Sequence, residues 1–353
     1  MHWIRSSICT AVVITAVALT TAACGSSGSS APFTVPTSGW TSSNGSFTPP
    51  ASLVSEAKKE GTLTVYTGLT TGSQVSAAFT KQYGIKVKTQ VFTASQLESA
   101  FSSQSAAHQY TADVVASAYD DFYPQSLSSG YFNPIDKEIP GFSSAYPSKY
   151  LLDNGQVPVG IILLTPIAYN SKLVSASQVP TSYAQLAEPK WKGKLISVSP
   201  STNPLLPELY ALIGKKYGVN VEKGIGGNTK RYYSTNATEL QALAAGEGSI
   251  AISGVIPIVA GLASSGAPVA VKNFDYETGA AFSEMASAHA PHPAAAALFL
   301  AWIYSKAGEM TQDKLLAASA PLDPTGLPSQ TVIAPPSTPQ VLADTENILG
   351  ISS

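Results

Sequence analysis

The stretch from Tyr232 to Pro257 reads YYSTNATELQALAAGEGSIAISGVIP and joins a polar loop, a helix and a strand. Asn236 stands where a helix N-cap belongs, and Glu239 follows at the third helical position, a pattern typical of a capping box. Gly246 ends the helix, and residues 250–252 form a short apolar run bounded by turn residues. The stretch therefore predicts one αβ unit with polar loops at both ends.

A similar arrangement opens the folded region. A strand over residues 63–66 leads into a hydroxyl- and glycine-rich loop at 68–73, a helix with apolar positions spaced by three and four residues, and a strand over 85–91. This order predicts a right-handed βαβ crossover with parallel strands. Further strands are expected over 112–116, over 157–170 as one strand that crosses between lobes, and over 267–272. The pattern predicts an α/β fold.

The composition is that of a soluble globular protein. The chain has 353 residues, of which 44% are hydrophobic and 12% charged, with a net charge of −2. This length is sufficient for two lobes with cores of their own. The 20 lysines and arginines are scattered, so the sequence has no basic patch of the kind that binds nucleic acid or anionic membranes.

The N-terminus predicts export from the cytoplasm. Arg5 precedes an apolar run over residues 8–20, and Cys24 follows small residues, so residues 1–23 resemble a bacterial lipoprotein signal and Cys24 a lipidation site. An ordinary secretory signal is the alternative. Residues 24–50 are rich in Ser, Gly and Pro, which predicts a tether to the cell membrane. The other cysteine, Cys9, lies in the signal, so the mature chain can hold no internal disulfide or cysteine metal site.

Three loops, at residues 70–73, 201–203 and 234–236, collect hydroxyl and amide side chains at strand ends or helix starts. Helix starts favour anions, although Ser, Thr and Asn are also ordinary helix caps. The residues expected to bind a ligand are Thr70, Thr71, Ser73, Ser117, Tyr119, Asp120, Ser201, Thr202, Asn203, Tyr233, Asn236 and Ser253.

Sequence motifs of catalysis are missing. The chain contains no Gly-x-Ser-x-Gly, no His-Glu-x-x-His and no Walker loop, and the glycines at 224–227 lack the spacing for dinucleotide binding. We therefore expect neither an enzyme nor a cofactor. A secreted hydrolase that uses a carboxylate remains the alternative from a different class.

The whole pattern resembles the extracellular solute-binding proteins of ABC importers, in particular the ferric-iron-binding-like group with the type II periplasmic-binding fold. The similarity covers residues 51–314 and rests on motifs in the family's order, which are LTVYTG at 63–68, ADV at 112–114, PKWKGK at 189–194, AAGE at 244–247 and HPAAAALF at 292–299.

The resemblance implies a two-lobed α/β protein with mixed sheets, helices on both faces and a hinge between the lobes. Residues 51–160 and 265–308 are expected in lobe 1, and residues 161–264 and 309–353 in lobe 2. It also implies a monomeric receptor that closes on a solute and delivers it to the permease and ATPase subunits of an importer.

The resemblance does not extend to the iron ligands. Iron-binding relatives hold the metal with a tyrosine pair after the strand that follows the Gly-Glu turn, where this chain has Ser253, Gly254 and Val255. Thr70 and Ala118 stand where other metal ligands lie in relatives, and Tyr232 and Tyr233 come before the helix. Because Fe³⁺ needs anionic oxygen ligands, no metal site is expected.

The anion site of the relatives is matched better. Residues 201–203 and Asn236 correspond to the segments that hold an anion beside the iron, so a small organic anion is favoured, with phosphonates and phosphorylated compounds first. The alternatives are a polyamine-like or thiamine-like cation, held by Tyr119, Asp120, Asp275 and Glu277, and ferric iron held through the tyrosines at 232–233.

Overall fold

Two mixed sheets form the framework of the protein in the computed structural model, which describes residues 33–203, 205–274, 276–316, 319–322, 327–328, 330–334 and 337–351. The residues from Thr34 onward group into one compact unit. The expected signal over residues 1–23 and the expected lipidation site Cys24 lie outside the described residues.

The first sheet has the strand order β15-β14-β5-β3-β4, with β8 also paired to β14. Strands β3, β4 and β5 run parallel, whereas β14 runs antiparallel to β5 and β8. The helix between β3 and β4 makes this the expected βαβ unit, which is confirmed. The strands are β3 (Thr62–Thr67), β4 (Lys86–Val91), β5 (Val114–Ala118), β8 (Ile161–Leu164), β14 (Tyr276–Ala286) and β15 (Gln330–Ile333).

The second sheet has the order β11-β10-β12-β9-β13. Strands β10, β11 and β12 are parallel, and β9 is antiparallel to both β12 and β13. The αβ unit expected from residues 232–257 is present, because a helix leads from β11 to β12. The strands are β9 (Ile167–Asn170), β10 (Leu195–Val198), β11 (Thr229–Tyr233), β12 (Ile250–Ala251) and β13 (Val269–Lys272).

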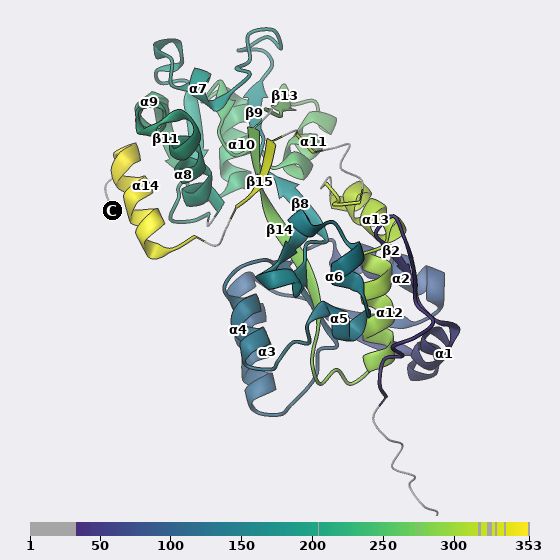
Figure 1. Ribbon diagram of the computed structural model, residues 1–353. Helices are drawn as coiled ribbons and strands as arrows, with labels where there is room; N and C mark the ends of the chain where they lie inside the picture. The colour runs from purple at the N-terminus through teal and green to yellow at the C-terminus, as the bar shows by residue number, and fades with distance from the viewer. Residues whose placement is uncertain are drawn as a thin grey trace, which may run out of the picture. The chain divides into compact units, whose positions relative to one another are not determined.

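Helices pack around both sheets (Figure 1). Around the first sheet lie α1 (Ala51–Glu60), α2 (Gly72–Tyr83), α3 (Ala94–Ala106), α4 (Phe122–Ser128), α5 (Ile135–Glu138), α6 (Phe142–Ala145), α12 (Pro293–Ile303) and α13 (Lys306–Leu316). Around the second lie α7 (Tyr183–Leu186), α8 (Leu205–Tyr217), α9 (Val219–Asn228), α10 (Asn236–Ala245), α11 (Ile256–Ser264) and α14 (Pro339–Leu349). The expected α/β architecture with mixed sheets is confirmed.

The chain crosses from the first sheet to the second at Thr165 and Pro166. The single strand expected over 157–170 is instead three, namely β7 (Val157–Pro158), β8 and β9, and β7 pairs with β6 (Leu151–Leu152). Proline has no backbone N–H, so Pro166 cannot continue a ladder, and the strand breaks there. The sequence analysis predicted correctly that the chain crosses here, but the strand is interrupted rather than continuous.

The return crossing is made by β14, which the sequence analysis missed. Its first residues, Tyr276–Gly279, pair with β15, and its last, Phe282–Ala286, pair with β5 (Figure 1). The two crossings contact each other, since the Thr165 hydroxyl donates to the Thr278 carbonyl oxygen at 3.0 Å. We call Thr165, Pro166 and the β14 residues beside them the hinge.

Sheet membership differs from the expected lobe boundaries at four elements. Strands β8 and β15 fall within the ranges assigned to lobe 2 but pair with β14 in the first sheet. Strand β13 falls within the range assigned to lobe 1 but pairs with β9 in the second sheet. Helix α13 extends into the range assigned to lobe 2 but packs against α2, α12 and β8. Helix α14 packs against α8 and α9, beside the second sheet.

The expected tether is partly a folded segment. Strands β1 (Thr41–Ser43) and β2 (Ser46–Thr48) form an antiparallel hairpin. Phe47 is buried and stacks on Phe142 with the ring centroids 5.1 Å apart, and the Ser46 hydroxyl accepts from the Lys306 amide at 2.9 Å. An aromatic anchor of this kind overrides the polar composition around it, so the prediction of an unstructured tether up to residue 50 was wrong for this hairpin.

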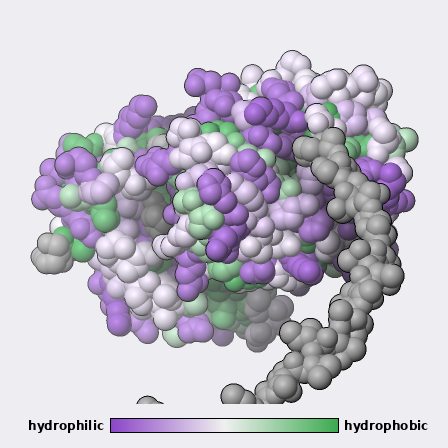
Figure 2. Space-filling model, turned by 90° about the horizontal axis from the view of Figure 1, so that it is seen from below, coloured by the Kyte–Doolittle hydropathy of each residue, from purple (hydrophilic) through white to green (hydrophobic). Residues whose placement is uncertain are grey.

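The surface is mixed in character. Figure 2 shows hydrophilic and near-neutral residues spread over one face, with small hydrophobic areas between them. Within the part of the chain that the structure describes, no helix has both the length and the apolar character needed to cross a membrane.

Candidate solute-binding site

A cavity of about 410 Å³ lies at the hinge, bordered by loops of both sheets. This volume falls within the range of ordinary ligand pockets. We call it the hinge cavity. Its lining residues are Gly68, Leu69, Thr70, Thr71, Leu163, Leu164, Thr165, Asn203, Leu205, Asn236, Val255, Ile256, Pro257, Ile258, Leu315 and Leu316.

Four helices begin at the hinge cavity. Thr71 is the N-cap of α2, Leu205 and Asn236 are the first residues of α8 and α10, and Val255 is the N-cap of α11. The first turn of a helix has amides without intrahelical partners and carries a partial positive charge. The hinge cavity therefore gathers several weakly positive helix ends and suits an anionic group.

Asn236 links the cavity to the protein interior. Its side-chain oxygen accepts from Nδ2 of Asn203 at 3.2 Å, and its own Nδ2 donates to Oγ of Ser253 at 3.0 Å. The expected capping box is wrong, because Thr235 caps the helix by accepting from the Thr238 amide at 3.1 Å. A threonine one residue earlier is a good cap, so Asn236 is free to turn toward the cavity.

The hydrogen bonds that start at Asn236 lead to a buried carboxyl group. Oγ of Ser253 donates to Oε2 of Glu239 at 2.8 Å, and both side chains are fully buried. Loss of hydration raises the pKa of Glu239 to about 8 against the lowering effect of these hydrogen bonds. At neutral pH this carboxyl is therefore mostly protonated and places little negative charge beneath the cavity.

The structure brings together four of the residues expected to bind a ligand, since Thr70, Thr71, Asn203 and Asn236 all line the hinge cavity. Ser253 lies directly behind Asn236. These residues come from loops on both sheets that are more than 100 positions apart in sequence, and the hinge makes them neighbours.

Other expected residues of the polar loops lie outside the cavity. Ser73, Ser201 and Thr202 are exposed and are not among its lining residues. The hydroxyl of Ser201 contacts Ser199 at 2.8 Å, and that of Thr202 donates to the Ser199 carbonyl oxygen at 3.1 Å. These two hydroxyls therefore help to shape the turn before α8.

Three more expected residues have structural contacts elsewhere. The Ser117 hydroxyl lies 3.0 Å from the Tyr123 hydroxyl in the first core, and Tyr119 donates to Oδ1 of Asp153 at 2.9 Å. Tyr233 packs in a core cluster of the second sheet and donates to Oε2 of Glu247 at 2.7 Å. None of the three is among the residues that line the hinge cavity.

Sequence reasoning missed the apolar wall of the cavity. Its side chains belong to apolar runs that are typical of a protein core, and only their place at the hinge reveals a second role. They are Leu69, Leu163, Leu164, Leu205, Val255, Ile256, Pro257, Ile258, Leu315 and Leu316.

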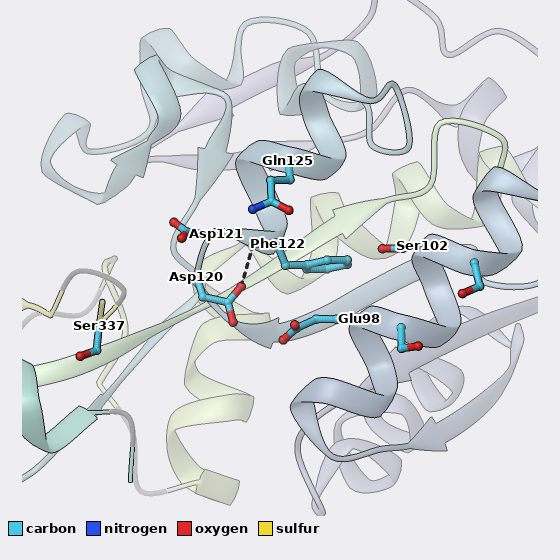
Figure 3. A pocket seen from close by; sticks show the side chains of 9 residues that line it. Glu98, Ser102, Asp120, Asp121, Phe122, Gln125 and Ser337 are labelled. Atoms are coloured by element: carbon cyan, nitrogen blue, oxygen red, sulfur yellow. Dashed lines mark hydrogen bonds between the residues drawn. The ribbon is translucent and has the colours of Figure 1, made fainter. Parts of the chain in front are cut away.

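Asp120 belongs to a different pocket, of about 590 Å³, between α3 and the start of α4 (Figure 3). Glu98 and Asp120 point toward one another there, and Oδ1 of Asp120 accepts from the Phe122 amide at 3.0 Å. The pKa of Glu98 is raised to about 7, mainly by burial and to a smaller extent by the charge of Asp120. Burial also raises the pKa of Asp120. We call this the acidic pocket; Asp121 and Ser337 also line it.

The residues named for a cation site do not form one box. Glu277 is fully buried, where it accepts from the Phe274 amide and from the Tyr183 hydroxyl, the latter at 3.2 Å. Asp275 lies outside the described residues. Among the residues that the structure describes, no group of three or more His, Cys, Asp or Glu could hold a metal ion.

The loop at Gly254 packs closely against the backbone of the hinge. The Gly254 amide donates to the Pro166 carbonyl oxygen at 2.6 Å, and a Cβ added to Gly254 would lie 2.8 Å from that oxygen. Such contacts are too short for a side chain, so the loop requires glycine here. Tyr232 and Tyr233 lie at the end of β11, and the Tyr232 side chain packs against the core of the second sheet.

Comparisons with known proteins identify the family and the fold. The family model for bacterial extracellular solute-binding proteins matches residues 63–310. A comparison with curated proteins gives no significant match.

Solved structures with the same fold include iron-bound HitA from Pseudomonas aeruginosa, with 22% identity over 82% of this chain and 97% of that one and a TM-score of 0.61. The substrate-binding protein of an ABC transporter from Agrobacterium tumefaciens has 16% identity, coverage of 84% and 97%, and a TM-score of 0.63. AfuA from Actinobacillus pleuropneumoniae, with fructose-6-phosphate bound, has 14% identity, coverage of 83% and 100%, and a TM-score of 0.59. The family model spans well over half of the chain, which therefore belongs to the bacterial extracellular solute-binding proteins.

Proposed function

We propose that the protein is the solute receptor of an ABC importer and that it binds a small organic anion in the hinge cavity. One observation carries the proposal, namely the convergence of four helix starts on a cavity whose lining contains no acidic side chain. Asn203, Asn236, Thr70 and Thr71 add neutral donors at the same place. Phosphonates and phosphorylated compounds are the first anions expected from the sequence.

The remaining parts of this role follow from the family. An extracellular solute-binding protein works outside the cytoplasm. We propose that it acts as a monomer, held to the membrane by lipid on Cys24, and that closure at the hinge signals an occupied site to permease and ATPase subunits.

The proposal is tested by replacing Asn236. Asn236→Asp preserves the size of the side chain but replaces two amide donors with a negative oxygen, so we expect at least tenfold weaker binding of an anionic solute. The solute is identified by native mass spectrometry of protein isolated from its host, and its affinity is measured by titration calorimetry. Thr202→Ala is the matched control, because Thr202 belongs to the neighbouring loop but lies outside the cavity. Equal affinity in wild type and Asn236→Asp would contradict the proposal.

A cationic solute is the second candidate, and the acidic pocket favours it. Glu98 and Asp120 share a half-buried position, and a bound ammonium group would relieve the repulsion between their ionised forms. Spermidine is a suitable probe. Binding of spermidine that Glu98→Gln removes and Asn236→Asp leaves intact would favour this candidate over the anion.

Ferric iron and hydrolysis are less well supported. The sequence has Ser253, Gly254 and Val255 where we expect the metal-binding tyrosines of relatives, and family membership favours binding over catalysis. Iron held by phenolate oxygens is coloured, so a colourless iron-treated sample argues against the iron alternative. Turnover of the bound solute by purified protein would revive the hydrolase.

A further inference from the structure

We infer that the anion bound in the hinge cavity is a medium-length carboxylic acid with a hydrocarbon body, rather than a phosphorylated compound. This inference rests on the proposed function and narrows it. The evidence is the division of the hinge cavity into a large apolar wall and a small set of donors.

The apolar wall excludes a hydroxylated body. Most side chains of the lining are apolar and offer no hydrogen-bonding atoms, among them those of Leu163, Leu164, Ile258, Leu315 and Leu316. A sugar placed against them would lose hydration at its hydroxyl groups without gaining partners, which is costly. A hydrocarbon chain or ring gains free energy from the same surface.

The polar side of the hinge cavity offers few free hydrogen-bond donors, because several donors there already have partners within the protein. The Leu205 amide donates to Oδ1 of Asn203 at 3.0 Å, and Pro257, the second residue of α11, has no N–H. One N–H of Asn203 serves Asn236, and one N–H of Asn236 serves Ser253. Nδ2 of Asn236 also donates to the Ser253 carbonyl oxygen at 3.3 Å, so its donors are turned toward Ser253, whereas Asn203 has one side-chain N–H left for a ligand.

Thr71 provides a further donor that needs a partner. Its Oγ1 atom is buried and has no hydrogen-bond partner among the described residues, although Thr71 lines the cavity. A buried hydroxyl of this kind is normally satisfied, so the atom points to a ligand or a water molecule. Together with the remaining N–H of Asn203, it gives two donors, which match the two oxygens of a carboxylate.

A phosphate monoester would be compensated poorly. It carries nearly two negative charges and three terminal oxygens, whereas the lining residues include no Lys, Arg or His. The partial charges of helix ends can balance a single charge, but a second buried charge without a cationic partner is unfavourable.

A homologous series tests the inference on the full chain. We expect the affinity for straight-chain carboxylates, from butanoate to octanoate, to rise about fourfold per methylene until the cavity is full, as burial of CH₂ groups predicts. Hexanamide has the hydrocarbon chain of hexanoate without its charge, and hexyl phosphate has a chain of similar length with nearly two charges. Both should bind at least tenfold more weakly than hexanoate in titration calorimetry.

A variant pair locates the hydrocarbon. Ile258→Ala should weaken octanoate binding severalfold more than butanoate binding, because it removes part of the apolar wall. Leu173→Ala is the control, since Leu173 is 52% exposed and lies outside the lining. Equal effects of Ile258→Ala on both acids would overturn the placement of the hydrocarbon.

The outcomes separate the inference from the proposed function. Tighter binding of hexyl phosphate than of hexanoate, or an affinity that does not rise with chain length, would overturn the inference and leave an anion receptor standing. Equal binding of hexanamide and hexanoate would overturn both, because charge would then play no part. Failure of every carboxylate to bind, with spermidine bound instead, would also overturn both.

Discussion

Glu239 is a carboxyl group that the fold keeps away from water. It accepts from Ser253 through Oε2, while Oε1 is buried with no partner among the described residues. Its pKa of about 8 lies above the ordinary value of 4.5, and loss of hydration is the main cause. The charge beneath Asn236 therefore depends on pH within a physiological range.

We expect Glu239 to make anion binding weaker at high pH. Above pH 8 Glu239 is mostly ionised, and its negative charge, which lies behind Ser253 and Asn236, repels an anion bound in the hinge cavity. The affinity should therefore fall between pH 7 and 9. Glu239→Gln cannot ionise and should remove this dependence. Calorimetry of the same anion at three pH values measures the effect, and an unchanged pH profile in the variant would contradict it.

At the scale of single residues, the sequence predicted the type of side chain better than its direction. Asn203 and Asn236 were named as ligand residues from two separate loops, because helix starts carry recognisable residue types, and the structure brings them within hydrogen-bonding distance. Capping rules did not reveal that Thr235 caps α10. Capping rules also could not show that Thr202 lies outside the cavity while Asn203 lines it, because the difference depends on the backbone path of one turn.

At the scale of elements, the loop from β12 to α11 is fixed against the hinge by a close backbone contact. Gly254 donates to the carbonyl oxygen of Pro166 at the point where the chain passes from β8 to β9. The loop carries Val255, Ile256 and Ile258, which line the cavity. Any change in the spacing of Gly254 and Pro166 therefore moves one wall of the cavity.

Gly254→Ala tests this contact. The added methyl group would lie 2.8 Å from the Pro166 oxygen, so we expect a loss of about 1–3 kcal/mol in the free energy of unfolding. Solute affinity should fall as well. Gly261→Ala is the matched control in α11, because nothing lies within 4 Å of the added carbon and alanine favours helix by roughly 0.5–1 kcal/mol. Equal stability of the two variants would contradict the contact. Chemical denaturation measures both.

Elements with a local signal were predicted well. The βαβ unit follows from spacings of three and four residues and from turn residues, and it forms as expected. Strand β14 was missed because its sequence contains Gly279, Ser283 and two glutamates, which are unusual in a buried strand. Only in the folded chain does the Glu277 carboxyl accept from Tyr183, 94 residues away, and does the Glu284 backbone amide donate to the Tyr304 hydroxyl, 20 residues away.

At the scale of the whole molecule, the cores contain several carboxyl groups with little access to water. Glu239, Glu277 and Glu284 are buried, and loss of hydration raises the pKa of each to about 8. The unfolded chain ionises these groups near pH 4.5, so between pH 4.5 and 8 the folded chain binds more protons. Its free energy of unfolding must then decrease as the pH rises.

We expect the thermal midpoint to fall from pH 5 to pH 8 and to level off above pH 8. Each such group contributes up to about 1.4 kcal/mol per pH unit between its unfolded and folded pKa values. Glu284→Gln should flatten the profile, whereas Glu56→Gln, at a partly exposed position of α1, should leave its slope unchanged. Scanning calorimetry across this range provides the measurement. A midpoint that rises with pH would contradict the assignment of these groups as neutral.

The hydrogen bond between Thr165 and Thr278 has a mechanical consequence. It extends the pairing of β8 with β14 as far as the residue before Pro166. The two crossings are therefore joined along their length up to this level, and we expect them to bend together rather than to slide past each other. The cavity residues on the paired strand, Leu163 to Thr165, would then move least during closure, and the rims of the cavity far from the hinge would move most.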